Sequence, residues 1–166
     1  MSAPFVIVRA QAEDAAALLE YLKIIGGETD NLSFGPEGVP LSVEQEASYL
    51  GMQAASTDHV QYLAKVDGQI IGTASLNRKP NRMRHRGEFG ISLKKAYWGC
   101  GAASALTEAV LAFARDNDFA QLNLEVRSSN ARAIHLYEKY GFRKLCVFPG
   151  FFKIDGKYID FDLMNL

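Results

Sequence analysis

The feature that most constrains the fold is the order in which two hydrophobic periodicities follow one another along the chain. In "GEFGISL", Phe89, Ile91 and Leu93 alternate with polar or small residues, as is typical of a half-buried strand. The run that begins near Ala102 instead repeats apolar residues every three or four positions, as is typical of an amphipathic helix. Because strand-type and helix-type runs are interleaved, the sequence predicts a mixed α/β sheet with helices on both faces.

Turn and cap residues set the predicted order: strand, two helices, three strands, helix, strand, helix and two strands. Asp67-Gly68 joins two β-type runs and is typical of a tight hairpin. Ser42, with Gln45 three residues later, predicts the start of the second helix, and Gly141 predicts the end of the last one. A length of 166 residues with 48% hydrophobic content suits one compact domain spanning 1–166.

Composition argues against several classes of protein. The net charge of −1 provides no overall basic field for nucleic acid. The basic cluster 77–86 is interpreted as a solvated loop, with contact to substrate or to a cofactor phosphate as the alternative. No apolar run approaches the ~18–20 residues of a membrane span, and the start of the chain lacks a signal-peptide pattern, so we expect a cytoplasmic protein. Two cysteines, Cys100 and Cys146, and three scattered histidines show no metal-ligand spacing, so no metal is expected.

The segment "YWGCGAASAL", residues 97–106, places two glycines and three alanines directly before a predicted helix. Small side chains leave backbone N–H groups uncovered, and the first turn of a helix has N–H groups without partners inside the helix. Such a turn favours a bound phosphate. Taken alone, the same residues are equally compatible with a tight connection between a strand and a helix.

Two motifs give the chain a resemblance to the GNAT superfamily of N-acetyltransferases over nearly its whole length. The acetyl-CoA signature Q/R-x-x-G-x-G/A is matched at Gly101 and Ala103, while Trp98 stands where Gln or Arg is usual. The second motif, N-x-x-A-x-x-L-Y-x-x-x-G-F, lies downstream and is matched by Asn130, Ala133, Leu136, Tyr137, Gly141 and Phe142. Beyond both motifs, the C-terminal "KIDGKYIDFDLM" resembles the branch that includes ribosomal-protein N-terminal acetyltransferases.

The resemblance implies the GNAT acyl-CoA N-acyltransferase fold, a mixed twisted sheet of about seven strands, with acetyl-CoA as cosubstrate. In this family the pantetheine arm enters a wedge between two splayed strands, and Gly90 is compatible with a bulge there. Main-chain groups of the strand then pair with the pantetheine, and the glycine–alanine turn holds the pyrophosphate. The implied cofactor-binding residues are Ile91, Ser92, Leu93, Gly99, Cys100, Gly101, Ala102, Ala103, Ser104, Asn130, Ala133 and Tyr137.

Acetyl transfer requires a neutral amine as nucleophile and a proton for the leaving thiolate. We favour Glu88 as the base, with Glu125 on the neighbouring predicted strand as the alternative; both also fit solvated charges on a strand. The family position of Tyr137 implies the acid, because a phenol with a pKa of ~10 stays protonated at neutral pH. From the sequence alone, Tyr137 fits a core aromatic better, because it shares a helical stripe with Ala133, Ile134 and Tyr140; the family match reverses that preference.

Three alternatives were weighed. A dinucleotide-binding glycine fingerprint fails because Ser104 replaces its third glycine. A covalent acetyl intermediate on Cys100 is disfavoured, because that sulfur would lie beside the pyrophosphate and away from the thioester. A binding module that holds acyl-CoA without catalysis remains the alternative function, and the retained Tyr137 argues against it.

The acceptor is expected to be an amine on a small molecule or a protein N-terminus. The resemblance implies that segment 26–40 and the final hairpin 148–157 shape the acceptor site. The first contains Glu28, Asp30 and Glu37, which would attract a cationic amine such as a polyamine, a peptide N-terminus or an aminoglycoside-like molecule. The same acids also fit an ordinary solvated loop. The resemblance leaves a homodimer open.

Overall fold

The computed structural model describes residues 4–166, which form a seven-stranded sheet in the order β1-β2-β3-β4-β5-β7-β6. Neighbouring strands are antiparallel except β4 and β5, which run parallel. The sheet is therefore mixed, as the sequence predicted. Its strands are β1 (Val6–Arg9), β2 (His59–Val66), β3 (Gln69–Arg78), β4 (Arg86–Leu93), β5 (Gln121–Arg127), β6 (Arg143–Ile154) and β7 (Lys157–Asn165).

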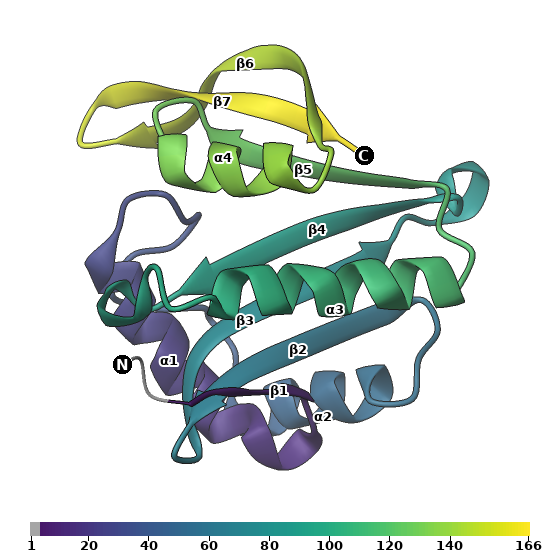
Figure 1. The fold of residues 1–166 in the computed structure, drawn as a ribbon. Helices are drawn as coiled ribbons and strands as arrows, with labels where there is room; N and C mark the ends of the chain where they lie inside the picture. Colours follow the sequence, from purple (N-terminus) through teal and green to yellow (C-terminus); the bar gives the residue numbers. More distant parts are fainter. Residues whose placement is uncertain (1–3) are drawn as a thin grey trace.

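Helices cover both faces of the sheet, which confirms the predicted layering. Helices α3 and α4 cross in front of the sheet in Figure 1, whereas α1 and α2 pack on the opposite face. The order of elements along the chain is also the predicted one. The helices are α1 (Ala15–Glu28), α2 (Val43–Gln53), α3 (Ala102–Asp116) and α4 (Ala131–Lys139), with short 3-10 turns at Ala12–Asp14, Asn81–Met83 and Lys95–Tyr97.

The two cores follow from strand alternation. In β2, Val60 and Ala64 face the core beneath α3, while Leu63 faces the core shared with α1 and α2. Because successive side chains of a strand point to opposite faces, one apolar strand supplies both cores. This explains why β2 is apolar on both sides rather than on alternate positions only.

Local signals placed the turns and caps correctly. Asp67 and Gly68 have φ of 48° and 79°, the left-handed pair that a two-residue hairpin requires. The Ser42 hydroxyl accepts from the Gln45 N–H at 3.1 Å, and the Gln45 side chain accepts from the Ser42 N–H at 2.9 Å. Gly141 has φ of 94° just beyond α4, as expected for a residue that ends a helix.

Strands β4 and β5 pair over only three residues and then part (Figure 1). The pairing covers Arg86, Gly87 and Glu88; beyond Glu88, β5 instead follows β7. The expected bulge at Gly90 is wrong, because β3 and β4 keep one register from Gly72↔Leu93 to Arg78↔Gly87. The wedge therefore arises because β5 turns toward its other neighbour, and β4 needs no inserted residue.

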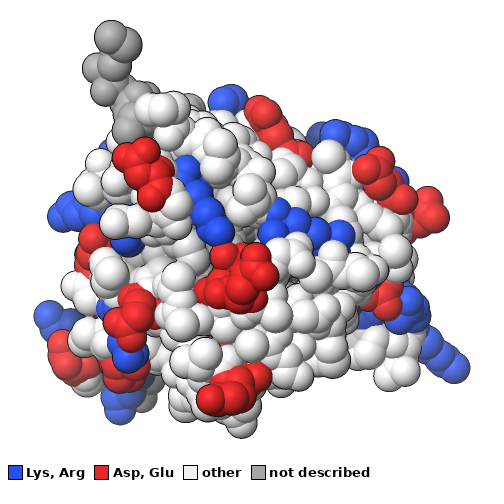
Figure 2. All heavy atoms as spheres, turned by 90° about the horizontal axis from the view of Figure 1, so that it is seen from below, with Lys and Arg blue, Asp and Glu red and all other residues white. Residues whose placement is uncertain are grey.

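Charged side chains of both signs are interspersed on the face of the molecule seen from below (Figure 2). Figure 2 shows acidic and basic groups side by side on one face, with no continuous patch of either sign. The basic cluster 77–86 is only partly the solvated loop expected, because Arg78 and Arg84 both pair with Asp58, at 2.8 and 3.1 Å. Among residues 4–166, no helix is both long and apolar enough to cross a membrane.

Candidate active site

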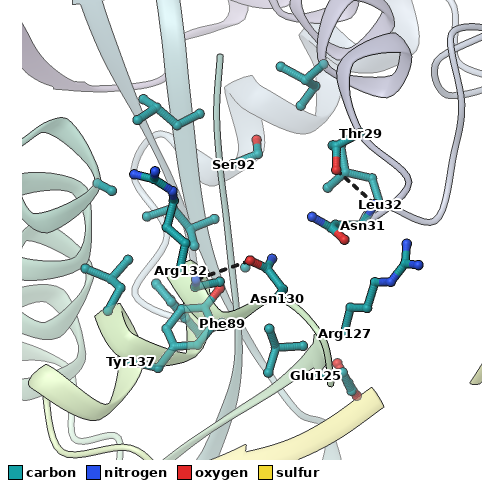
Figure 3. Close-up of a pocket in the computed structure, with 18 of the residues that line it drawn as sticks. Thr29, Asn31, Leu32, Phe89, Ser92, Glu125, Arg127, Asn130, Arg132 and Tyr137 are labelled. Atoms are coloured by element: carbon teal, nitrogen blue, oxygen red, sulfur yellow. Dashed lines mark hydrogen bonds between the residues drawn. The ribbon is translucent and has the colours of Figure 1, made fainter. Parts of the chain in front are cut away.

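A cavity of about 1150 Å³ opens where β4 and β5 part. Its walls come from both strands, the first turns of α3 and α4, the segment after α1, and the β6–β7 hairpin; Figure 3 shows part of this lining. The predicted site residues that line it are Glu88, Ile91, Ser92, Leu93, Gly99, Gly101, Ala103, Ser104, Asn130, Ala133 and Tyr137. Residues that lie far apart in the sequence therefore line the same cavity.

The glycine–alanine turn forms an open cradle at the start of α3. Gly99 and Gly101 have φ of 81° and 92°, and a Cβ added at either would meet no atom within 4 Å. The left-handed backbone explains the glycines, and the open space leaves the first-turn N–H groups of α3 accessible to an anion. Cys100 and Ala102 instead pack against the core and do not line the cavity.

Two basic side chains that the sequence reasoning missed stand beside this cradle. The Arg132 guanidinium lies 4.9 Å from the centre of the Trp98 ring, whose Nε1 donates to the Leu93 carbonyl at 3.2 Å. Lys139 donates to the Ser104 hydroxyl at 3.3 Å. Their spacing of seven residues on α4 was the available signal, because it places both side chains on one face of the helix.

Tyr137 combines a packed ring with a hydroxyl in the cavity. The side chain is 6% exposed, and its ring lies 5.9 Å from that of Phe89 and 5.8 Å from that of Phe142. Burial raises the pKa of the phenol well above its usual value, so the proton stays bound at neutral pH. Within residues 4–166, its hydroxyl has no hydrogen-bond partner, which leaves it available to a ligand.

Three charged groups meet at the point where the strands part. Partial burial, and then the neighbouring Glu88 carboxylate, raise the pKa of Glu125, while the charge of Lys79 lowers it. Lys79 in turn donates to the Glu88 carboxylate. The sequence predicted the two carboxylates as alternatives, whereas the structure places them side by side. Lys79 belongs to the basic cluster 77–86, whose sequence favoured a solvated loop.

The remaining wall lies between the segment after α1 and the β6–β7 hairpin. Arg127 projects into the cavity there, and its Nε donates to the Ser129 hydroxyl at 3.1 Å. Of the three acids expected to attract a cation, Glu28 accepts from the Lys95 N–H at 2.9 Å, and Glu37 accepts from the Gly35 N–H at 2.8 Å. No cluster of three metal-ligating side chains occurs among residues 4–166.

The comparisons with known proteins place the chain in a family. The model of the acetyltransferase (GNAT) family matches residues 29–142. An uncharacterised N-acetyltransferase of Mycobacterium tuberculosis is 32% identical over 131 residues, which cover 74% of this chain and 81% of that protein. Matches to an L-amino acid N-acetyltransferase of Escherichia coli and to N-acetyltransferase 8F1 of Mus musculus cover 63% and 46% of those proteins, so the chain spans only part of their length.

Solved structures agree with this placement. A GNAT-family acetyltransferase from Streptococcus pneumoniae has a TM-score of 0.94 and 32% identity, with 98% of this chain and 99% of that one covered. An acetyltransferase from Salmonella typhimurium, solved with its cofactor acetyl-CoA, shares the fold with a TM-score of 0.85 at 20% identity, over 98% of this chain and 93% of the other. The chain belongs to the GNAT family of acetyl-CoA-dependent N-acetyltransferases.

Proposed function

We propose that this protein transfers an acetyl group from acetyl-CoA to a primary amine by direct attack within a ternary complex. The acceptor is an amine-bearing small molecule or a protein N-terminus, and relatives named for acetylation of amino acids support an amine acceptor. One observation carries the proposal: the wedge between β4 and β5, the glycine cradle and the Tyr137 hydroxyl all open into the same cavity.

The cradle residues suit the diphosphate of the cosubstrate. Main-chain N–H groups of residues 99–104 would hold the pyrophosphate, with Cys100 and Ala102 contributing only their backbone. The unpaired edge of β4 at Ile91, Ser92 and Leu93 would bind the pantetheine amides as an added strand does. Asn130, which caps α4 by accepting from the Ala133 N–H at 3.3 Å, would contact the same arm.

Tyr137 would supply the proton for the leaving sulfur. Bound acetyl-CoA supplies a thioester, whose sulfur departs as a thiolate unless a proton arrives. The raised pKa of Tyr137 keeps that proton in place at neutral pH, and the ring contacts to Phe89 and Phe142 fix where the hydroxyl lies. The phenol is therefore protonated at neutral pH and can act as an acid without a second group that supplies its proton.

The Glu88–Glu125 pair would take the proton from the amine. A base works best when its pKa approaches the working pH, and Glu125 is the member of the pair whose pKa is raised. Glu88, which accepts from Lys79, lies beside it. We therefore assign the accepting atom to Glu125 and the supporting charge to Glu88, which reverses the order favoured from the sequence.

The test is the release of free coenzyme A thiol from acetyl-CoA in the presence of a panel of amines. We expect release that depends on the amine, falls at least ~100-fold in Tyr137→Phe, and is unchanged in Tyr49→Phe, a matched substitution at an exposed position on α2. Cys100→Ala should remain active, because direct attack needs no acetylated cysteine. Tight binding of acetyl-CoA with no amine-dependent release would instead favour a non-catalytic acyl-CoA-binding module.

A further inference from the structure

We call the part of the cavity bordered by the segment after α1 and the β6–β7 hairpin the acceptor half. An uncompensated positive charge, that of Arg127, lies there. Arg127 follows Glu125 by two residues on β5, so both side chains project from the same face of the strand, with Cα atoms roughly 6–7 Å apart. Within residues 4–166, no carboxylate lies within 4.0 Å of the guanidinium, whose one hydrogen bond uses Nε. Figure 3 shows the side chain reaching toward Asn31 and Leu32, away from Tyr137.

An aromatic wall stands next to this charge. Phe161 on β7 is the register partner of Arg127, so the two side chains lie on the same face of the sheet. The Phe161 ring lies 4.7 Å from that of Phe151 and 4.3 Å from that of Phe152. All three rings line the cavity together with Leu32 from the segment after α1. The acceptor half therefore offers a cation and an apolar surface side by side.

We infer that the acceptor is a free α-amino acid with an apolar or aromatic side chain, an inference that rests on the proposed transfer to an amine. The amine turns toward the Glu88–Glu125 pair, the carboxylate binds the Arg127 guanidinium, and the side chain packs on Phe151, Phe152 and Phe161. A guanidinium presents parallel N–H donors that match a carboxylate, which fixes the orientation as well as the charge of the ligand.

The other expected acceptors fit these groups less well. A polyamine carries no anion and would bring a second positive charge beside Arg127 and Lys79. The N-terminal residue of a protein has an amide where an amino acid has a carboxylate, and a neutral amide gains less from the guanidinium. The cavity thus favours the free amino acid over both.

The experiment compares L-phenylalanine, L-phenylalaninamide and spermidine as acceptors at saturating acetyl-CoA. The variants are wild type, Arg127→Gln, Arg127→Lys and, as a matched control, Arg115→Gln at an exposed position in the last turn of α3. We expect wild type to prefer phenylalanine over its amide by at least ten-fold in kcat/KM. Arg127→Gln should raise KM for phenylalanine at least ten-fold with little change in kcat, Arg127→Lys should recover part of the loss, and Arg115→Gln should match wild type.

Equal use of phenylalanine and its amide, or an unchanged KM in Arg127→Gln, overturns the inference. So does acetylation confined to spermidine or to peptide N-termini, although the proposed function would then stand. Calorimetric titration with acetyl-CoA separates the two claims: failure to bind acetyl-CoA, together with no thiol release for any amine, removes the proposed function as well. Intact acetyl-CoA affinity in Arg127→Gln shows that the variant is folded.

Discussion

Tyr137 is the residue in which packing and chemistry meet. Its ring contributes to the core with Phe89 and Phe142, while its hydroxyl has no partner among residues 4–166. Tyr137→Phe keeps the ring contacts and removes only the proton donor. We predict a fall in kcat of about 10²–10⁴-fold with the acetyl-CoA Kd unchanged, measured by thiol release and calorimetry. A kcat within two-fold of wild type would contradict the role assigned to the phenol.

Arg132 is expected to replace the polar or basic side chain, Gln or Arg, that the family signature usually places at the position of Trp98. The guanidinium stacks on the Trp98 ring beside the cradle. Arg132→Gln should weaken acetyl-CoA binding several-fold at low salt and less at 1 M salt, where charges are screened within ~3 Å. Calorimetry at two salt concentrations measures this difference. The same loss at both concentrations would show that packing rather than charge is involved.

The sequence predicted some of these residues and not others for a physical reason. Tyr137 and the glycines occupy fixed positions in short motifs, so local spacing identified them. Arg127 and Arg132 are charged residues on periodic segments, and Lys79 belongs to a basic loop; in both settings a solvated position has the same sequence pattern as a ligand position. Only the folded arrangement, which brings them to one cavity or one carboxylate, separates the two cases.

At the scale of elements, the junction of β4 and β5 should control the pH dependence of the reaction. A protonated Glu125 cannot accept the amine proton, so kcat/KM should fall as pH decreases through its pKa, which lies above the ordinary ~4.3 of a glutamate. Removing the positive charge in Lys79→Met should raise that pKa further and move this acidic limb to higher pH. Removing the negative charge in Glu88→Gln should move it to lower pH.

The pH profile of kcat/KM for each variant provides the measurement. Lys157→Met, at the exposed first residue of β7, serves as the control for loss of a lysine charge and should leave the acidic limb in place. A limb that does not move in Lys79→Met and Glu88→Gln would remove Glu125 from the role of base.

The start of α1 depends on a second charged pair, far from the cavity. Asp14 accepts from Lys65 Nζ at 2.7 Å and from the Gln11 N–H at 2.8 Å. Burial raises the pKa of Asp14, but these hydrogen bonds and the Lys65 charge outweigh it, so the pKa is lowered overall. Asp14→Asn should cost about 1–3 kcal/mol at pH 7, because Lys65 then loses its partner.

The sign of the pH dependence follows from that lowered pKa. The contribution of Asp14 is present above its unfolded pKa of ~3.9 and is lost as pH falls through the folded value. Urea unfolding should therefore separate wild type from Asp14→Asn at pH 7 and bring the two together as the pH is lowered below ~4. An equal difference at pH 7 and at pH 2 would show that the ion pair contributes nothing.

Elements were easier to predict than the relation between them. The hairpin at Asp67-Gly68 and the caps at Ser42 and Asn130 depend on residues within three positions of one another. The parting of β4 from β5 depends on β7, which lies more than 60 residues along the chain from β4. The prediction of a bulge at Gly90 was wrong because it explained the parting of the strands by a residue within β4, whereas the pairing of β5 with the distant β7 causes it.

At the scale of the whole molecule, the strand order builds the cavity from both ends of the chain. Because β7 lies between β5 and β6, the C-terminal hairpin reaches the side of the cavity that the segment after α1 also borders. The acceptor half therefore combines residues near position 30 with others near position 150. The family resemblance implied that meeting, although no local sequence pattern signals it. Of the residues implied to bind the cofactor, all except Cys100 and Ala102 line the cavity.

The central claim is that the glycine cradle beside the parted strands holds acetyl-CoA, and isothermal titration with acetyl-CoA tests it most directly. The matched variants are Gly101→Ala and Gly68→Ala, since both glycines have a positive φ and open space around an added Cβ, but only Gly101 lines the cavity. We predict saturable binding of one acetyl-CoA by wild type and by Gly68→Ala, and at least ten-fold weaker binding by Gly101→Ala. Wild-type protein that gives no saturable heat with acetyl-CoA would contradict the account.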